Sequence, residues 1–286
     1  MTALLHLIQS MTTLSSLVED IYKVLKGGQQ IEDSLYEELA NDIVNTLRNR
    51  LSTTEHRRKN LSLSSIGKPL RRLWYDLKDP EEYVEEPSAR LKFLYGDIIE
   101  DIILWLAKVS GHTVTDRQRE VSHFGIVGHI DSIIDGEVVD AKSASPHSFV
   151  KFSKGTLPDN DPFGYLAQIQ AYDEEVGNGH PGFLAVDKVS GEICLYQPDK
   201  DFDLPNTEKL IQDAKDALDR DTPPTTKCYS DVADGKSGNR KLSIGCSCCP
   251  HKFKCWKNLR AFKYSDGIRY LTTVANTPKV EEIKND

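Results

Sequence analysis

The chain has 286 residues, 38% of them hydrophobic, and a formal net charge of −8, so it can bury a full core and is not a generally basic nucleic-acid binder. No apolar run approaches the roughly 18 residues of a membrane span, and the opening MTALLHLIQSMTT lacks the basic segment of a signal peptide. We therefore expect a soluble cytoplasmic protein with no membrane partner, built as one large domain with appendages.

The first 111 residues are predicted to be mainly helical. Apolar residues recur at helical spacing through residues 1–50, with a break at Gly27-Gly28, which predicts two or three helices. An acidic, proline-bounded loop at 79–87 precedes a longer helix predicted over residues 88–111. Gly96 lies inside that helix, where glycine costs about 1 kcal/mol relative to alanine, so we expect a strand or ligand to approach closely there.

The stretch GHIDSIIDGEVVDAK is typical of a β-hairpin. Asp135-Gly136 suits a type I′ turn because both turn positions need positive φ. This register places Asp131 directly opposite Asp140, and it puts Lys142 further along the same face, opposite His129. Opposed carboxylates with Cβ atoms about 4.5–5.5 Å apart repel, and a divalent cation between them would offset that repulsion. The alternative is a solvated face, and the hairpin alone leaves both open.

The remaining elements predict an α/β layering with a mixed sheet. Three strands are expected at 113–123, 125–134 and 137–144, followed by a functional loop at 143–160. A helix is expected from Asp161-Pro162 onward, then a second hairpin at 182–197 and a last helix at about 207–220. On the helix after the loop, Gln168 and Tyr172 are four residues apart and project from one face. Their interest depends on whether that face looks toward the hairpin.

Cysteines gather near the C-terminus. Cys246, Cys249 and Cys255 form C-x₂-C-x₅-C, which supplies three thiolates for a tetrahedral zinc or an iron–sulfur cluster. Cys228 is the expected fourth ligand, because Cys248 neighbours two of the others too closely to point inward with them. Without a secretory signal a disulfide framework is not expected. Free buried thiols are the alternative, and four thiolates suit zinc and iron–sulfur equally.

Positive charge is segregated along the chain. Eight Lys or Arg residues and one acid lie between residues 48 and 72, and eight with no acid lie between 235 and 265. Two basic passages flanking a more acidic centre suit a protein that grips phosphates at its edges and holds cations in the middle. A single such passage is usually a solvated face, and two weaken that alternative without removing it.

Three motifs in their order resemble the RecB-type branch of the PD-(D/E)XK nucleases. They are GHID, VVDAK and QIQAY, where that family has G-h-x-D, (D/E)-x-K and Q-x-x-x-Y. More closely, SSIGKPLRRLWYDL, FLYGDIIED, DPFGYLAQIQAY and DGKSGNRKL followed by CSCC are similar to exonucleases encoded by tailed phages, over roughly residues 61–270. The C-x₂-C-x₅-C resembles the staple that holds a 4Fe–4S cluster in some members.

The resemblance implies roles for particular residues. The groups that would hold Mg²⁺ or Mn²⁺ are the carboxylates of Glu100, Asp131 and Asp140 and the carbonyl of Ala141. Lys142 would orient or deprotonate the attacking water and stabilise the charge that develops on phosphorus. Two residues on the next helix would position the DNA strand near the scissile phosphate, Gln168 and Tyr172.

We therefore expect an α/β fold with a restriction-endonuclease-like mixed sheet flanked by helices. An N-terminal helical region (1–60), a nuclease core (61–225) and a cysteine-cluster and basic segment (226–286) divide the chain. The expected function is a metal-dependent DNA exonuclease, phage-encoded and acting in the host cytoplasm in DNA degradation, recombination or replication. The alternatives are an endonuclease of the same fold and a non-catalytic nucleic-acid-binding module organised by the cysteine site.

Overall fold

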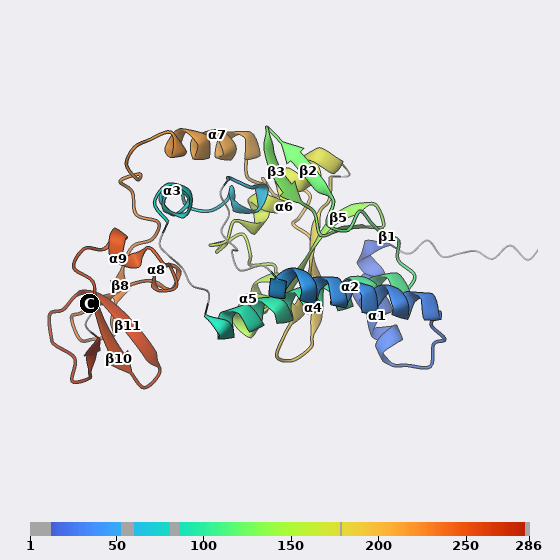
Figure 1. The fold of residues 1–286 in the computed structure, drawn as a ribbon, viewed down its shortest axis with the longest axis horizontal. Coiled ribbons are helices and arrows are strands. Elements are labelled where there is room, and N and C mark those ends of the chain that lie inside the picture. Colours follow the sequence, from blue (N-terminus) through green and yellow to red (C-terminus); the bar gives the residue numbers. More distant parts are fainter. Residues whose placement is uncertain (1–12, 53–59, 81–85, 178, 284–286) are drawn as a thin grey trace, which may run out of the picture.

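A five-stranded mixed sheet forms the centre of the molecule (Figure 1). The structure, a computed structural model, describes residues 13–52, 60–80, 86–177 and 179–283. The strands lie in the order β1 (Val114–Thr115), β4 (Ser132–Ile134), β5 (Glu137–Ala144), β6 (Gly182–Asp187) and β7 (Ile193–Tyr196). Strands β5 and β6 are parallel and the other neighbours are antiparallel. The predicted α/β class with a mixed sheet is confirmed.

Helices cover both faces of this sheet, because alternate residues of β5 and β6 are apolar on each side. Val139 and Leu184 pack with α1 (Leu17–Leu25) and α4 (Pro87–Val109). Val138 and Phe183 pack on the opposite face with the helices α5 (Pro146–Ser153) and α6 (Tyr165–Val176) and the short helix η2 (Leu63–Ser65). The alternation sends Asp140 and Lys142 toward the α6 face.

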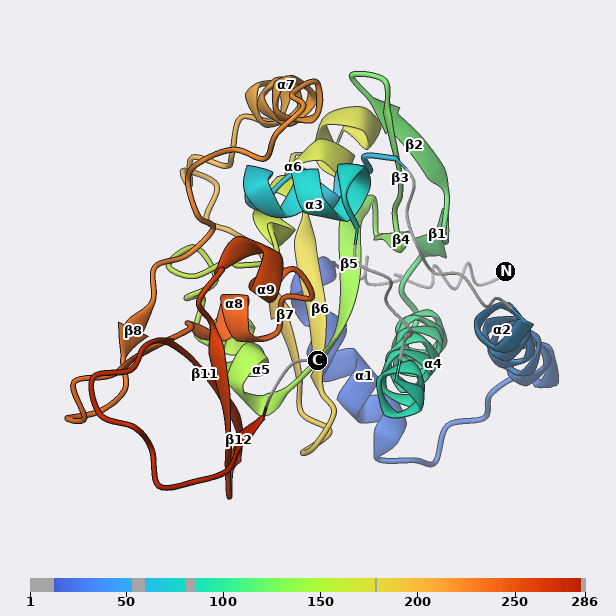
Figure 2. The same cartoon turned by 60° about the vertical axis from the view of Figure 1, so that its left-hand side comes forward.

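Three more helices, α2, α3 and α7, lie outside this core (Figure 2). Helix α2 (Asp33–Ser52) lies along α4, and α3 (Leu70–Lys78) packs against α7 (Thr207–Leu218). The predicted break at Gly27-Gly28 separates α1 from α2, and the backbone there has positive φ. A short turn η1 (Leu14–Ser16) precedes α1, and the part of that prediction on residues 1–12 lies outside the described residues.

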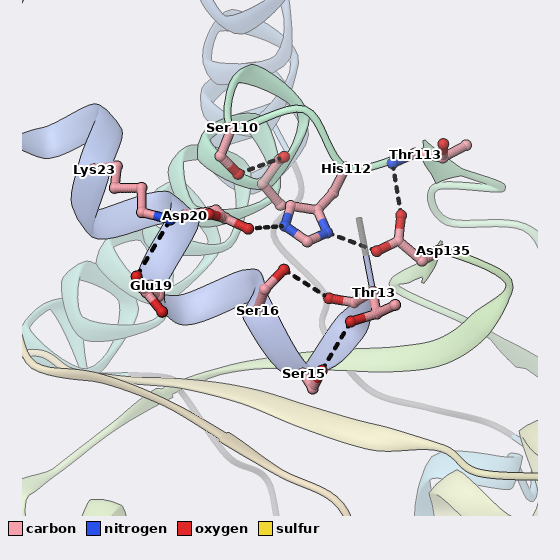
Figure 3. Close-up of polar contacts among 11 residues, drawn as sticks. Thr13, Ser15, Ser16, Glu19, Asp20, Lys23, Ser110, His112, Thr113 and Asp135 are labelled. Carbon is pink, nitrogen blue, oxygen red and sulfur yellow. Dashed lines mark hydrogen bonds and ion pairs between the residues drawn. The ribbon is translucent and has the colours of Figure 1, made fainter. Parts of the chain in front are cut away.

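The predicted hairpin turn is confirmed. Asp135 and Gly136 both have positive φ, 49° and 91°, and Ile133 faces Val138 as the two-residue turn requires. His112 fixes the turn to the N-terminal helix: its Nδ1 lies 2.6 Å from Asp135 Oδ2 and its Nε2 lies 3.4 Å from the Asp20 carboxylate of α1 (Figure 3). The hairpin turn is thereby tied to α1.

The hairpin's outer part differs from the prediction. The expected strand 125–134 is split, because β3 (Ile126–His129) pairs with β2 (Glu120–His123) in a separate two-stranded sheet. His129 is therefore opposite Glu120, and the expectation that it lies opposite Lys142 is wrong. The cause is a competing partner, since the Ile130 N–H donates to the Arg119 carbonyl.

Two other sequence expectations have clear outcomes. The stretch 143–160 is not a plain loop but contains α5, which begins with Ser145 as its N-cap and a proline in the first turn. The close approach expected at Gly96 is confirmed, because a Cβ there would lie 2.9 Å from Ser143 Oγ on β5. Helix α4 can therefore lie directly against the strand that carries Asp140.

A second five-stranded sheet lies beside the central one, coloured orange to red in Figure 1. Its strands, in spatial order, are β12 (Glu282–Ile283), β10 (Arg260–Tyr264), β11 (Gly267–Thr273), β9 (Arg240–Lys241) and β8 (Val232–Ala233). Two of the clustered cysteines lie on short helices, Cys246 on α8 (Ile244–Ser247) and Cys255 on α9 (Lys252–Cys255). Among the described helices, none is long and apolar enough to cross a membrane.

Candidate functional site

An open cleft of about 810 Å³ lies between α2, α4, α6 and the start of the hairpin. It is lined by four of the predicted site residues, which come from three separate parts of the chain: Glu100, Asp131, Gln168 and Tyr172. The face of α6 that carries Gln168 and Tyr172 looks toward the hairpin, which was the condition that the sequence left open.

Asp140 lies behind these residues and does not itself line the cleft, with 1% of its surface exposed. Its Oδ1 accepts a hydrogen bond of 3.1 Å from Gln168 Nε2, and its Oδ2 pairs with the Lys142 ammonium. Lys142 keeps 20% of its side chain exposed and lies 5.1 Å from the centre of the Tyr165 ring. Asp140 is therefore oriented by groups on its own strand and on α6.

Asp131 does not pair directly across the sheet with Asp140, so that expectation is wrong in its geometry. The ladder between β4 and β5 ends at Ser132 and Val139, and Asp131 Oδ2 instead accepts a hydrogen bond of 2.9 Å from the Ala141 N–H. The Asp131 carbonyl accepts from the Gln118 N–H at 3.3 Å, which draws the chain away from the ladder. The Asp140 carboxylate is nevertheless close enough to act on the pKa of Asp131.

Burial and the charge of neighbouring carboxylates raise the pKa values of two cleft residues, Asp131 and Glu100. Burial, and then the charge of Asp140, raises the pKa of Asp131 to about 7. The pKa of Glu100 is raised well above its usual range, first by burial and then by Asp131. Ionisation of all three carboxylates would therefore place more negative charge here than Lys142 balances, and without a cation Glu100 and Asp131 retain protons instead.

Lys142 shows the opposite influence. Burial alone would lower its pKa, but the charges of Asp140 and Asp131 outweigh that effect and raise the pKa above its ordinary value. A lysine in this state is a cation at neutral pH, which favours a role in charge stabilisation over the removal of a proton from water.

Glu100 reaches the cleft from α4 and meets a residue that the sequence did not single out. Gln118 Nε2 donates a hydrogen bond of 2.8 Å to Glu100 Oε1 and lies 3.5 Å from Asp131 Oδ1. No local pattern points to a glutamine on an exposed loop, so only the folded arrangement identifies it. Tyr165 beside Lys142 was missed for the same reason.

Tyr172 is 1% exposed and lies under the glycine of the GHID motif. A Cβ on Gly128 would come within 2.7 Å of Tyr172 Cε1 and 2.8 Å of Leu63 Cβ, which explains why this position has no side chain. Gln168 Nε2 also lies 3.4 Å from the Tyr172 hydroxyl, and burial followed by the charge of Asp140 raises the pKa of Tyr172 to about 12.

The four predicted cysteine ligands lie close together beside α3. Burial, and then the proximity of Cys246 and Cys255, raises the pKa of Cys228 to about 11. Arg71 Nε donates to Cys255 Sγ at 3.1 Å. Cys248 is exposed, as expected from its position, and all six cysteines are free thiols.

Much of the predicted basic character is neutralised by internal contacts. In the second passage, Arg240 pairs with Asp231 and Arg260 with Glu282, acids that lie outside the passage in sequence. In the first, Arg72 pairs with Asp76. Residues 53–59 of the first passage lie outside the described residues. The linear charge segregation is thus a weaker guide to a phosphate-binding surface than it first indicates.

The described side chains do not form a metal-binding group in this arrangement. In the described part of the chain, no three His, Cys, Asp or Glu side chains form a group that could hold a metal ion. The finding applies both to the carboxylates Glu100, Asp131 and Asp140 and to the cysteine cluster. Neither predicted metal site is therefore established by the geometry alone.

Comparisons with known proteins give little further information. No model of a protein family matches the chain, and no curated protein matches it. A solved structure titled "Crystal structure of SSO0001" is similar at a TM-score of 0.37 and 18% identity, covering 66% of this chain and 89% of that one. Similarity at this level supports no conclusion about fold family or function.

Proposed function

We propose that this protein is a metal-dependent deoxyribonuclease that degrades DNA from its ends, with a restriction-endonuclease-like core of the RecB type. The observation that carries the proposal is the position of Asp140, which is buried, paired with Lys142 and hydrogen-bonded by Gln168. It lies directly behind an open cleft that Gln168 and Asp131 line. For a phage-encoded enzyme of this kind, the setting would be the host cytoplasm.

Mg²⁺ or Mn²⁺ would be held by Glu100, Asp131 and Asp140, with the Ala141 carbonyl as a further oxygen donor. Two features support the fit. Every donor is an oxygen, which hard cations prefer, and the raised pKa values of Glu100 and Asp131 are those of carboxylates that lack a balancing cation. When bound, such a cation supplies a water of lowered pKa and offsets charge on the phosphate.

Lys142 would contribute positive charge to the phosphate as it gains negative charge. Its side chain keeps 20% of its surface exposed, and its raised pKa keeps it protonated. An ammonium ion fixed by Asp140 costs no reorganisation when the charge develops, which is the general basis of electrostatic catalysis.

Gln168 and Tyr172 would act through Asp140 more than on DNA itself. Gln168 orients the Asp140 carboxylate, and Tyr172 is too deeply buried to stack on a base. This modifies the role that the sequence resemblance implies for them, which was direct positioning of the strand.

The cysteine cluster would hold a structural 4Fe–4S cluster, with Zn²⁺ as the alternative. Four thiols that could ligate a metal lie near one another, and the Arg71 guanidinium, which donates to Cys255, places a positive charge beside them. The bound metal would fasten the irregular C-terminal segment to α3.

The experiment compares end-labelled linear duplex DNA with a covalently closed circle of the same sequence, in Mg²⁺ and in EDTA. We expect nucleotides to be released from the linear DNA in Mg²⁺ only, while the circle is spared. Cleavage of the circle would identify an endonuclease, and two intact substrates would leave only a binding module. An Asp140→Asn preparation controls for contaminating nucleases.

A further inference from the structure

Gln118 connects two carboxylates that come from different elements. Its side-chain nitrogen donates to Glu100 Oε1 at 2.8 Å and lies 3.5 Å from Asp131 Oδ1. Glu100 stands on α4 and Asp131 immediately before β4, so the two side chains have no shared backbone to hold them together. One amide with two N–H groups can serve both oxygens at once.

The backbone holds Gln118 in a conformation that a non-glycine residue seldom adopts. Its φ is 54°, and Asp116 in the same loop has a φ of 53°. The Gln118 N–H donates to the Asp131 carbonyl at 3.3 Å. A residue persists in this region only where its surroundings determine it, and such positions concentrate at functional sites.

The neighbouring residue, Arg117, anchors the loop. Its guanidinium pairs with Asp101 on α4 at 2.7 Å and also with Asp42 on α2. Arg117 therefore fixes the loop to the same helix that carries Glu100, one residue before Asp101. The Gln118 amide is held in place before any ligand arrives, although its side chain is exposed in the cleft.

We infer that Gln118 is a positioning residue that holds the Glu100 carboxylate beside Asp131, so that both are available to one divalent cation. The inference rests on the proposed function. Without the amide, the two carboxylates would lose the hydrogen-bond donor between them, and their mutual repulsion on ionisation would favour separation. Cation binding would then have to bring the carboxylates together, and the free energy that this requires would lower the affinity for the cation.

The test measures Mn²⁺ affinity by calorimetry, without DNA, for wild type, Gln118→Met, Glu100→Gln and the double variant. Methionine keeps the length of the side chain and removes the donor. We expect Gln118→Met to weaken Mn²⁺ binding by about 5- to 30-fold, which corresponds to about 1–2 kcal/mol. In the Glu100→Gln background the same change should have little further effect, because the group that Gln118 positions is already lost.

Gln212→Met is the matched control, since Gln212 makes a similar hydrogen bond to Asp216 on α7, far from the cleft. It should bind Mn²⁺ as wild type does. If Gln118→Met also binds as wild type does, or if its effect persists in full without the Glu100 carboxylate, the inference is overturned. If wild type binds no Mn²⁺, the proposed function itself fails, so the two failures are distinguishable. Equal thermal unfolding of wild type and Gln118→Met in EDTA confirms that the variant folds.

Discussion

Gln168 on α6 donates a hydrogen bond of 3.1 Å to Asp140 on β5, across the interface between the helix and the sheet. Asp140 is 1% exposed, and its second oxygen pairs with Lys142. The carboxylate is thus oriented from both sides. The contact joins two motifs that lie 28 residues apart in the chain and places Asp140 directly behind the cleft that Gln168 lines.

Replacing Gln168 by alanine should impair activity more than folding. The change leaves one oxygen of a buried carboxylate without its donor, and loss of such a supporting hydrogen bond typically costs about 10- to 100-fold in activity or metal affinity. Nuclease rates at saturating DNA measure the effect. Gln170→Ala is the control, because Gln170 bonds Glu174 on the outer side of the same helix. Equal rates for the two variants would contradict the assigned role.

Asp131→Asn should stabilise the cation-free protein at high pH. The folded-state pKa of Asp131 is about 7 against an ordinary value of 3.8, so its contribution to stability is full below about pH 4 and is lost as the pH rises through about 7. The variant avoids this loss, and we expect it to be more stable than wild type by about 1–3 kcal/mol at pH 8 in EDTA. Denaturant unfolding at pH 8 and pH 5 measures the difference, which should shrink at the lower pH.

Mg²⁺ should reverse that difference, since the cation offsets the repulsion only when both aspartates are present. Asp116→Asn serves as the control, because Asp116 is a carboxylate of the adjacent loop whose pKa is lowered by its hydrogen bond with Arg119. It should gain no stability at pH 8. A wild type as stable as Asp131→Asn at pH 8 in EDTA would show that the carboxylates do not repel in the folded state.

Gly128→Ala should destabilise the fold. The added methyl group would lie 2.7 Å from Tyr172 Cε1 and 2.8 Å from Leu63 Cβ, and both residues are fully buried. Overpacking of this kind costs about 1–3 kcal/mol. Thermal unfolding measures it, with the adjacent and exposed Val127→Ala as control. An unchanged melting temperature would mean that Tyr172 can shift without cost.

Metal at the cysteine cluster should be measurable in the protein as purified without chelators. We expect iron with visible absorbance, or zinc without it, and loss of the metal from Cys246→Ser and Cys255→Ser. Cys194→Ser should keep the metal, because Cys194 lies on β7 in the central sheet and away from the cluster. Removal of the metal should lower the melting temperature. Metal-free protein from cells supplied with iron and zinc would refute the site.

Local chemistry made part of this structure predictable. The Asp135-Gly136 turn follows from two residues that tolerate positive φ, and the hairpin register follows from the turn. The close approach at Gly96 follows from the cost of a glycine within a helix. The gathering of Glu100, Asp131 and Gln168 in one cleft was reached only through the resemblance to a nuclease family.

Other features could not be predicted because segments distant in the sequence compete for the same hydrogen-bonding partners. Asp131 leaves the ladder because a loop residue, Gln118, takes its carbonyl, and β3 turns to a separate sheet because β2 offers a better partner. No short pattern around Gln118 indicates a side chain that would meet Glu100. The basic passages were misleading in the same way, since the acids that pair with Arg240 and Arg260 lie outside the basic run.

The most direct test of the central claim is the single-turnover digestion of end-labelled linear DNA by Lys142→Met at saturating Mg²⁺. Methionine removes the ammonium that pairs with Asp140, so we expect the rate to fall by about 10²–10³-fold while DNA affinity in EDTA stays within about threefold of wild type. Lys151→Met, which loses only a bond to the Asn160 carbonyl, should digest DNA normally. Digestion by Lys142→Met at the wild-type rate would contradict the proposed nuclease site.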